Sequence, residues 1–440
     1  MRVVIVGGGP TGLFTAIALA RRDHEVVLID RDPGPPQNGA WPRKGVMQFH
    51  HAHTFRGPVV DALRAEMPDV LGELTGAGAV VADGPDGRPA ALLCRRATFD
   101  ALVRRCTVAE PGVTVLTGHV DGLIHDRGRT RGVAWQSGGT VADLVLDATG
   151  RASRLTNGLR APAEGGDCGA VYIDRQYQLR PGAPAGPVNS PIGLSLGFPG
   201  YFAIAFLHDN RTFSITFAHD GSDRRLRGLR HGEVFDAAVR AIPQLSEWID
   251  PQRARPITPV LPGGRLYNSY CGQLGDAGGL ATPGMISVGD AVCTTTPLAG
   301  RGVTLALRQS QALLGALDRN GSDVDSAARQ FDEWCTDRIR PWFEDHRHAD
   351  ADRLRRWGGG DVDVTRRLPS DVVVAAAAAD ERLRPVVEPF ARMDALPASL
   401  DSVEPIARQL YARGWRPAVP DGPTRTELAE VCDTRATEVA

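Results

Sequence analysis

The fold is decided near the start of the chain, where residues 2–30 read RVVIVGGGPTGLFTAIALARRDHEVVLID. The apolar run from Arg2 to Val6 predicts a short buried strand, and the periodic apolar residues from Leu13 to Leu19 predict a helix. Glycines between them indicate a tight turn, and a second strand is expected over residues 25–29. The order strand, turn, helix, strand predicts a parallel βαβ unit and hence an α/β fold.

Three glycines of this turn, Gly7, Gly9 and Gly12, have the spacing G-x-G-x-x-G. The first permits the tight turn, the second lets the backbone approach a pyrophosphate, and the third lets helix and strand pack closely. Asp30 ends the second strand, where a carboxylate can accept hydrogen bonds from a ribose hydroxyl. The segment therefore predicts a dinucleotide site, and the pattern fits NAD(P) and FAD equally well.

Composition limits the remaining classes of function. The 440 residues suggest two or three folded units, and 50 basic against 52 acidic side chains give a net charge of −2. Without a basic excess or an arginine-rich block, no nucleic-acid partner is expected. We expect a cytoplasmic protein without a membrane span, because no apolar run approaches the required length and no signal-peptide layout is present. The seven cysteines lack a C-x-x-C pair, which argues against disulfides and structural zinc.

A further unit of strand, loop and helix is expected over residues 284–317, which contain GMISVGDAV and TPLAGRGV. Asp290 follows the strand, where it can bind a polyol hydroxyl. Gly300 and Gly302 permit a close backbone approach and leave N–H groups at a helix N-terminus. This arrangement favours a site for the edge of an electron-rich ring.

The motif G-D-A followed by P-x-x-G-x-G, combined with the first glycine motif, resembles the FAD-dependent monooxygenases related to p-hydroxybenzoate hydroxylase (PHBH). Residues 143–154, DLVLDATGRASR, resemble the middle fingerprint of these proteins but depart from its usual Asp-Gly step. This form, like residues 42–53 (PRKGVMQFHHAH), is similar to a bacterial branch that includes polyether epoxidases. The resemblance implies FAD as the cofactor, with Asp290 on the ribityl chain and residues 297–303 along the isoalloxazine.

By resemblance, Arg43 and Arg96 would face the cofactor and its phosphates, and Val120 would offer its backbone near the adenine. The cofactor-binding residues expected from motifs and resemblance are Gly7, Gly9, Pro10, Thr11, Gly12, Asp30, Arg31, Arg43, Arg96, Val120, Asp290, Pro297, Gly300, Arg301, Gly302 and Val303. The expected catalytic residues are Gln48, His51 and Pro297. His50, His51 and His53 have no carboxylate or thiolate at ligand spacing, so no metal site is expected.

The expected architecture interleaves two domains. A Rossmann-type FAD-binding domain takes residues 1–75, 94–160 and 272–322, an antiparallel-sheet substrate domain takes 76–93 and 161–271, and a helical C-terminal region takes 323–440. Strands are expected over residues 192–196, 201–207 and 212–218, and residues 79–93 are expected to add a further hairpin to the same sheet. The side chains expected to line the substrate pocket form two alternative sets, Tyr201, Ala203, Ala205 and Phe206, or Thr212, Ser214 and Thr216.

The function expected from the resemblance is insertion of one oxygen atom from O₂ into a small organic, secondary-metabolite substrate, by hydroxylation or epoxidation through a flavin C4a-hydroperoxide. NADPH or NADH would supply electrons directly or through a separate flavin reductase, in a monomer or homodimer. The alternatives are a flavin halogenase, a double-bond reductase and a non-enzymatic FAD-binding protein. A halogenase is expected to carry W-x-W-x-I-P, which this sequence lacks, although Lys44 could form a haloamine.

Overall fold

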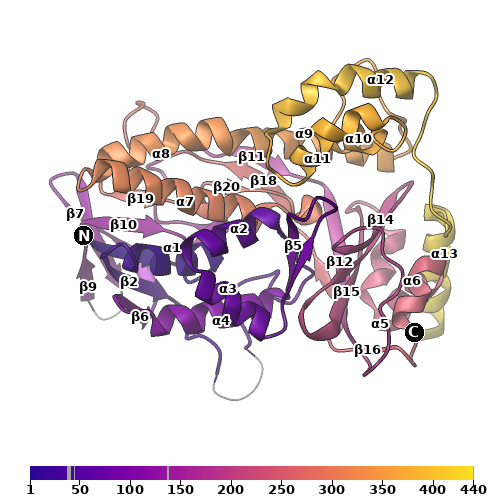
Figure 1. Cartoon of the computed structure of the whole chain (residues 1–440), viewed down its shortest axis with the longest axis horizontal. Coiled ribbons are helices and arrows are strands. Elements are labelled where there is room, and N and C mark those ends of the chain that lie inside the picture. Colours follow the sequence, from indigo (N-terminus) through magenta and orange to yellow (C-terminus); the bar gives the residue numbers. More distant parts are fainter. Residues whose placement is uncertain (37–40, 44, 136–137, 440) are drawn as a thin grey trace.

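Three parts of the chain lie side by side in the computed structural model, which describes residues 1–36, 41–43, 45–135 and 138–439 (Figure 1). A parallel sheet with its helices forms one half, a large antiparallel sheet forms the other, and a group of C-terminal helices lies over their junction. No helix in the described ranges is long and apolar enough to cross a membrane.

The parallel sheet is assembled from three distant stretches of sequence in the strand order β19-β10-β1-β2-β6. Its strands are β1 (Arg2–Val6), β2 (Glu25–Asp30), β6 (Val113–Thr117), β10 (Leu144–Asp147) and β19 (Met285–Ser287). All neighbouring strands run parallel, so their carboxyl ends share one edge. In such sheets ligands bind at that edge.

Both faces of the parallel sheet are covered, because alternate side chains of each strand enter different apolar clusters. Val3 and Ile5 pack with helices, whereas Val4 and Val6 pack with a small antiparallel sheet. The helices on the first face include α1 (Pro10–Ala20), α4 (Arg96–Ala109) and α7 (Gly302–Asn320). The small sheet on the second face contains β7 (Val120–Asp126), β8 (Arg129–Trp135) and β9 (Gly138–Val141).

The hairpin expected at residues 79–93 forms, but its expected place in the large sheet is wrong. Strands β4 (Val80–Asp83) and β5 (Pro89–Leu93) pair instead with β3 (Phe55–Arg56), in the order β3-β5-β4. Phe55 is fully buried opposite Leu92, which gives the hairpin an apolar partner from its own half of the molecule. Helices α2 (Gly57–Glu66) and α3 (Pro68–Gly76) connect β3 to this hairpin.

The large antiparallel sheet has the order β13-β14-β15-β12-β16, with β17 also paired to β12. Its strands are β12 (Ala170–Leu179), β13 (Gly193–Phe198), β14 (Tyr201–Leu207), β15 (Thr212–Asp220), β16 (Ala254–Pro256) and β17 (Leu261–Gly263). Helices α5 (Gly232–Arg240), α6 (Pro243–Ser246) and α13 (Arg425–Val439) lie at its outer side (Figure 1). A three-stranded sheet of β11 (Glu164–Asp167), β18 (Tyr267–Tyr270) and β20 (Cys293–Thr294) joins the two halves.

The C-terminal helices, which were expected over residues 323–440, are built on an apolar stripe. Phe331, Ile339, Trp342 and Phe343 are all buried, and the helix is interrupted at Ile339, directly before Arg340 and Pro341. The helices are α8 (Val324–Arg338), α9 (Arg340–Trp357), α10 (Ser370–Ala376), α11 (Arg384–Ala391) and α12 (Glu404–Ala412).

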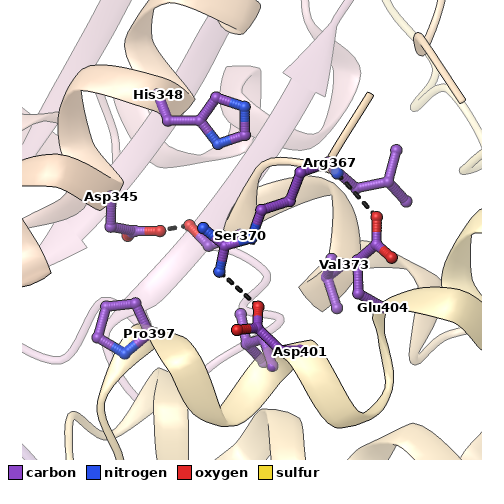
Figure 2. A pocket seen from close by; sticks show the side chains of 10 residues that line it. Asp345, His348, Arg367, Ser370, Val373, Pro397, Asp401 and Glu404 are labelled. Carbon is purple, nitrogen blue, oxygen red and sulfur yellow. Dashed lines mark hydrogen bonds and ion pairs between the residues drawn. The ribbon is translucent and has the colours of Figure 1, made fainter. Parts of the chain in front are cut away.

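A cavity among these helices is lined by Asp345, Arg367, Ser370 and Asp401 (Figure 2). Its volume is about 10 Å³, room for a single water molecule. Arg367 pairs with Asp401 and Ser370 bonds Asp345 across it. This cavity is far too small for a cofactor.

Candidate functional site

The glycine turn sits at the carboxyl edge of the parallel sheet, between β1 and α1. A Cβ on Gly12 would lie 1.9 Å from the Gly7 carbonyl oxygen, so close packing of helix on strand requires glycine there. A Cβ on Gly9 would meet nothing within 4 Å. The turn therefore presents bare backbone to open space at the N-terminus of α1, as a pyrophosphate requires.

Asp30 holds this turn from the end of β2. Its Oδ2 accepts a hydrogen bond from the Gly8 N–H at 2.6 Å, and its Oδ1 accepts one from Asp32 at 2.9 Å. Arg31 extends instead over Gly45, where a Cβ would lie 2.3 Å from its guanidinium. The ribose contact of Asp30 remains a prediction, and it would use the lone pairs that these bonds leave free.

Two arginines meet one buried carboxylate beside the glycine turn. Asp100 is fully buried, and its Oδ2 lies 2.5 Å from Arg43 Nη1 while its Oδ1 lies 2.6 Å from Arg96 Nε. Arg43 also donates to the Gly8 carbonyl at 2.5 Å and reaches Asp30 at 3.5 Å. Both arginines expected at the cofactor thus lie together beside the glycine turn, held in place by Asp100, and their charge-assisted hydrogen bonds to phosphate remain a prediction.

Arg104 is a further basic residue here, which the sequence reasoning missed. Arg96, Asp100 and Arg104 lie four residues apart on α4 and are all buried, so they share one helix face. Arg104 donates to the Asp32 carbonyl at 3.1 Å, and its Nη1 is buried without a hydrogen-bond partner next to Gly8. The four-residue spacing of these charged residues in the sequence could have indicated that they share one helix face.

Asp290 lies opposite the glycine turn, on the loop that follows β19. Gly289 has a φ of +72°, and a Cβ there would lie 2.7 Å from the Thr11 hydroxyl, so the two motifs pack directly on each other. The Asp290 carboxylate forms no hydrogen bond or ion pair within the described part of the chain. Burial raises the pKa of Asp290, and the charges of Arg96 and Arg151 oppose that shift. A polyol hydroxyl would give this carboxylate the partner that it lacks.

The middle motif stabilises its own loop. Asp147 is fully buried and accepts hydrogen bonds from the Thr149 hydroxyl at 2.6 Å and the Ser153 hydroxyl at 2.5 Å. This leaves Arg151 as the charged group of the motif that faces Asp290, stacked 5.6 Å from the Tyr267 ring. The motif therefore contributes a positive charge rather than a carboxylate to the site.

Residues 297–303, here called the ring-side loop, are tied to the C-terminal helices. Gly300 has a φ of +61°, and a Cβ there would lie 3.1 Å from the Thr54 side chain, so the loop packs against Thr54. Arg56 donates to the Ala299 carbonyl at 2.6 Å and to the Ala391 carbonyl at 2.9 Å. Arg56 thus connects the ring-side loop to the end of α11.

The side chain of Arg301, one of the expected cofactor-binding residues, points towards the C-terminal helices. Its guanidinium bonds Asp345 at 2.8 Å and lies 4.7 Å from the Trp342 ring, because the acidic and aromatic partners that can stabilise it are on the C-terminal helices. The contact of Arg301 with the cofactor remains a prediction, which its backbone could provide. Gly302 faces open space, since a Cβ there would meet nothing within 4 Å.

Of the three neighbouring histidines, His53 lies beside the cofactor groups. Its Nδ1–H donates to the His51 carbonyl at 3.1 Å, and its Nε2 accepts from Arg96 at 3.3 Å. Burial and the nearby Arg96 charge lower the pKa of His53 to about 3. His53 is therefore neutral and is a poor proton donor.

His51 reaches the large sheet instead. It is buried, and its Nδ1 lies 2.9 Å from Asp174 Oδ2 on β12. The Gln176 side chain fixes the same loop by donating to the His50 carbonyl at 2.6 Å. Gln48 is half-buried, and its side chain forms no hydrogen bond within the described part of the chain, so its catalytic role stays a prediction.

The large sheet turns one face to these loops, and the expected pocket residues are divided between its two faces. Tyr201, Ala203 and Ala205 pack into the outer cluster with Phe235 of α5, so they are wrong as pocket walls. The opposite face carries Ser214 and Thr216, with Phe202, Ile204 and Phe206 paired beside them in register. Successive side chains of a strand point to opposite faces, and this alternation places neighbouring residues of β14 on different sides of the sheet.

The buried His208, whose Nε2 contacts the Ser214 hydroxyl at 2.8 Å, makes the stability of the protein depend on pH. Burial lowers the pKa of His208 to about 4. Since the unfolded chain binds the proton near pH 6.5, stability falls as pH drops from 6.5 towards 4, by about 2 kcal/mol at pH 5. Urea unfolding of the His208→Gln variant should show this loss reduced, whereas the exposed His231→Gln control should keep it. Equal losses in both variants would contradict the assignment.

The residues at the carboxyl edge fit FAD on three observations. Gly9 offers bare backbone at a helix N-terminus, Arg43 and Arg96 supply two positive charges next to it, and Asp290 presents a carboxylate without a partner. These groups suit the pyrophosphate and the ribityl chain of the dinucleotide, and their contacts with FAD remain a prediction. The contacts expected of Val120 and Pro297 are not tested by this geometry and remain predictions.

Comparisons with known proteins agree with this cofactor. A family model described as FAD dependent oxidoreductase matches residues 2–71. D-amino acid dehydrogenase 2 of Ralstonia nicotianae is 35% identical over 60 residues, which span only 14% of either chain. That match therefore covers only a small part of each protein.

Longer matches extend over both halves of the molecule. Kynurenine 3-monooxygenase of Salinispora arenicola is 27% identical over 89% of this chain and 90% of its own. 6-Methylpretetramide 4-monooxygenase of Streptomyces rimosus is 25% identical over 70% of this chain and 73% of its own.

Solved structures share the fold at low identity. PqsL of Pseudomonas aeruginosa, described as a probable FAD-dependent monooxygenase, matches 82% of this chain and 98% of its own with a TM-score of 0.60 and 16% identity. The flavin-dependent brominase Bmp2 matches 94% of this chain and 100% of its own with a TM-score of 0.63 and 14% identity.

Proposed function

We propose that this chain, an FAD-dependent oxidoreductase with the PHBH-like fold, is a monooxygenase that inserts one oxygen atom from O₂ into a small organic substrate. The observation that carries the proposal is the position of the ring-side loop. Its Leu298 packs in one apolar cluster with Tyr172 and Ala218 of the large sheet. The cofactor edge and the inner face of that sheet therefore adjoin across a single loop.

FAD supplies the chemistry that protein side chains lack, namely electron transfer to O₂. The chain contributes binding, orientation and exclusion of water. Arg43, Arg96 and Asp290 would hold the cofactor, while Phe202 and Ile204 present apolar surface to a substrate. Trp357 of α9 lies 5.2 Å from the Phe202 ring and covers that surface from the C-terminal side.

Hydroxylation of an aromatic ring is the form of oxygen insertion that we favour. Two relatives with matches over most of their length are named as monooxygenases of kynurenine and of 6-methylpretetramide. Likeness to a brominase at 14% identity supports the fold alone, and the W-x-W-x-I-P segment expected of a halogenase is missing from the sequence. Lys44, the candidate haloamine residue, lies outside the described residues.

The experiment uses the FAD-loaded protein mixed with NADH or NADPH under anaerobic conditions and then with O₂. We expect the flavin absorbance to bleach with a pyridine nucleotide, or with an added flavin reductase, and to return on aeration with consumption of O₂. A reduced protein that is stable in air but reduces unsaturated compounds would contradict the proposal and favour the double-bond reductase.

The role of Asp290 gives a separate prediction. Asp290→Asn removes the charge from the proposed ribityl contact, and a hydrogen bond to a charged group contributes about 1.5–3 kcal/mol. FAD should therefore bind about 10- to 100-fold more weakly, as measured by quenching of flavin fluorescence. Because the carboxylate is half-buried and forms no hydrogen bond or ion pair in the described part of the chain, the apoprotein should melt no lower than the wild type. Unchanged FAD affinity would show that this loop is misassigned.

A further inference from the structure

Polar groups without partners gather on the inner face of the large sheet. The Tyr172 hydroxyl, Asp174 Oδ1 and the Thr216 hydroxyl are all buried and form no hydrogen bond in the described part of the chain. Asp174 lies directly opposite Thr216 in the register of β12 and β15, and Tyr172 points to the same face two residues away. Buried polar groups of folded proteins rarely lack partners, so these three groups indicate a polar ligand.

His51 adds the strongest acceptor to this group. Asp174 Oδ2 also accepts the Ala52 N–H at 2.9 Å, and an N–H can only donate, so Oδ2 acts as an acceptor. The His51 Nδ1 at 2.9 Å from the same oxygen therefore carries a proton, and Nε2 holds the lone pair. Nε2 forms no hydrogen bond within the described part of the chain. A histidine oriented in this way by a buried carboxylate is arranged as a general base.

The surroundings match a hydroxyl group attached to a ring. Ile204 lies opposite Thr216, and Phe202 lies opposite Ala218, so apolar side chains adjoin the polar group along β14. The Tyr172 ring contacts His51 edge to face at 4.8 Å and shares its cluster with Leu298 of the ring-side loop. A ligand bonded to His51 would thus meet both the apolar wall and the cofactor loop.

We propose that His51 and Asp174 form a dyad that binds and deprotonates the hydroxyl group of a hydroxyaromatic substrate. The substrate O–H bond breaks, its proton moves to Nε2, the electron pair stays on the oxygen, and Asp174 stabilises the imidazolium. The resulting anion makes the ring a better nucleophile towards activated oxygen. This inference rests on the proposed function for its purpose, whereas ionisation of the ligand can be measured without turnover. His51 is the catalytic residue and Asp174 its positioning residue.

Other charged or titratable groups lie close to the dyad. His50 and His53 flank His51 on its own loop, Tyr172 adjoins it on β12, and Arg96 lies behind His53. His53 is neutral because it is held between a carbonyl and Arg96, and His50 is exposed. Within this group only His51 combines a free ring nitrogen with a carboxylate partner.

The experiment titrates the FAD-loaded protein with para-nitrophenol, whose anion absorbs visible light, at a pH below the pKa of the free phenol. We expect the bound probe to be mainly the anion, and para-nitroanisole, which has no proton to lose, to show no such change. In His51→Gln the affinity for the anion should fall about 10-fold or more, the effect of one charge-assisted hydrogen bond. His50→Gln, which changes the exposed neighbour, should behave like the wild type.

The Asp174→Asn variant tests whether Asp174 acts on His51 through its charge or only through its shape. The asparagine oxygen can take the place of Oδ2 and still accept from both Ala52 and His51 Nδ1, but it carries no charge to stabilise the imidazolium that forms when the probe loses its proton. The probe should then bind as the neutral phenol, and Asp174→Glu should restore part of the anion signal. A merely structural role would lower affinity without changing the ratio of anion to phenol.

Several results would overturn the dyad. They are binding of the neutral phenol to the wild type, no binding of para-nitrophenol, or an anion signal that survives in His51→Gln. A protein that ionises the probe but consumes no O₂ would refute the proposed function and leave the dyad in place. If both dyad variants consumed O₂ at the wild-type rate, the dyad would be refuted and the proposed function would stand.

Discussion

Replacing Gly9 by valine is expected to abolish FAD binding while the protein remains folded. The backbone of Gly9 has a φ of −78°, which valine adopts without strain, and a Cβ there meets nothing within 4 Å. The isopropyl group would instead fill the space that the pyrophosphate needs above the N-terminus of α1. Overpacking against atoms that cannot move aside costs about 3 kcal/mol or more, so FAD affinity should fall about 100-fold or more in a fluorescence titration.

Gly12 provides the matched control, because it belongs to the same motif but has another role. Its added Cβ would lie 1.9 Å from the Gly7 carbonyl, so Gly12→Val should lower the melting temperature of the apoprotein itself. Gly9→Val should melt like the wild type by circular dichroism. If Gly9→Val bound FAD like the wild type, the proposed pyrophosphate position would be incorrect.

Asp100→Asn is expected to destabilise the apoprotein by about 3 kcal/mol, since removal of one partner from a buried ion pair leaves an uncompensated charge. Asp100 is fully buried between Arg43 and Arg96, whose side chains are 4% and 7% exposed. Urea unfolding measures the change. Glu73→Gln breaks the exposed pair between Glu73 of α3 and Arg105 of α4, and should cost less than about 1 kcal/mol.

FAD should return part of the stability lost in Asp100→Asn. If Arg43 and Arg96 face the phosphates, the bound cofactor supplies the negative charge that the variant lacks. Saturating FAD should therefore raise the melting temperature of the variant by more than that of the wild type. An equal rise in both proteins would mean that neither arginine faces the cofactor.

The cofactor half of the fold could be predicted because its signals are local. The strand, turn and helix of residues 2–20 form where the apolar pattern and the glycines indicated them. Asp290 could be placed for the same reason, since its strand and helix lie on either side of it in sequence. The resemblance to the PHBH-like flavin monooxygenases is confirmed by the similarity of the chain to known proteins of that kind.

The substrate half depended on contacts that no local pattern encodes. His51 could be chosen as a candidate, but its partner Asp174 is 123 residues away, and nothing in the intervening sequence joins them. The sheet face was ambiguous because β15 is buried on both sides over Thr212–His219, so alternation of polarity gave no direction. Arg301 likewise turned towards Asp345, a partner 44 residues further along the chain.

The most direct test of the central claim is titration of the purified protein with FAD, followed by its visible absorbance and fluorescence. The account predicts saturation at one FAD per chain, with a perturbed flavin spectrum and loss of binding in Gly9→Val. A wild-type protein that leaves the spectrum of free FAD unchanged at all concentrations would contradict the site at the carboxyl edge of the parallel sheet, and with it the proposed monooxygenase.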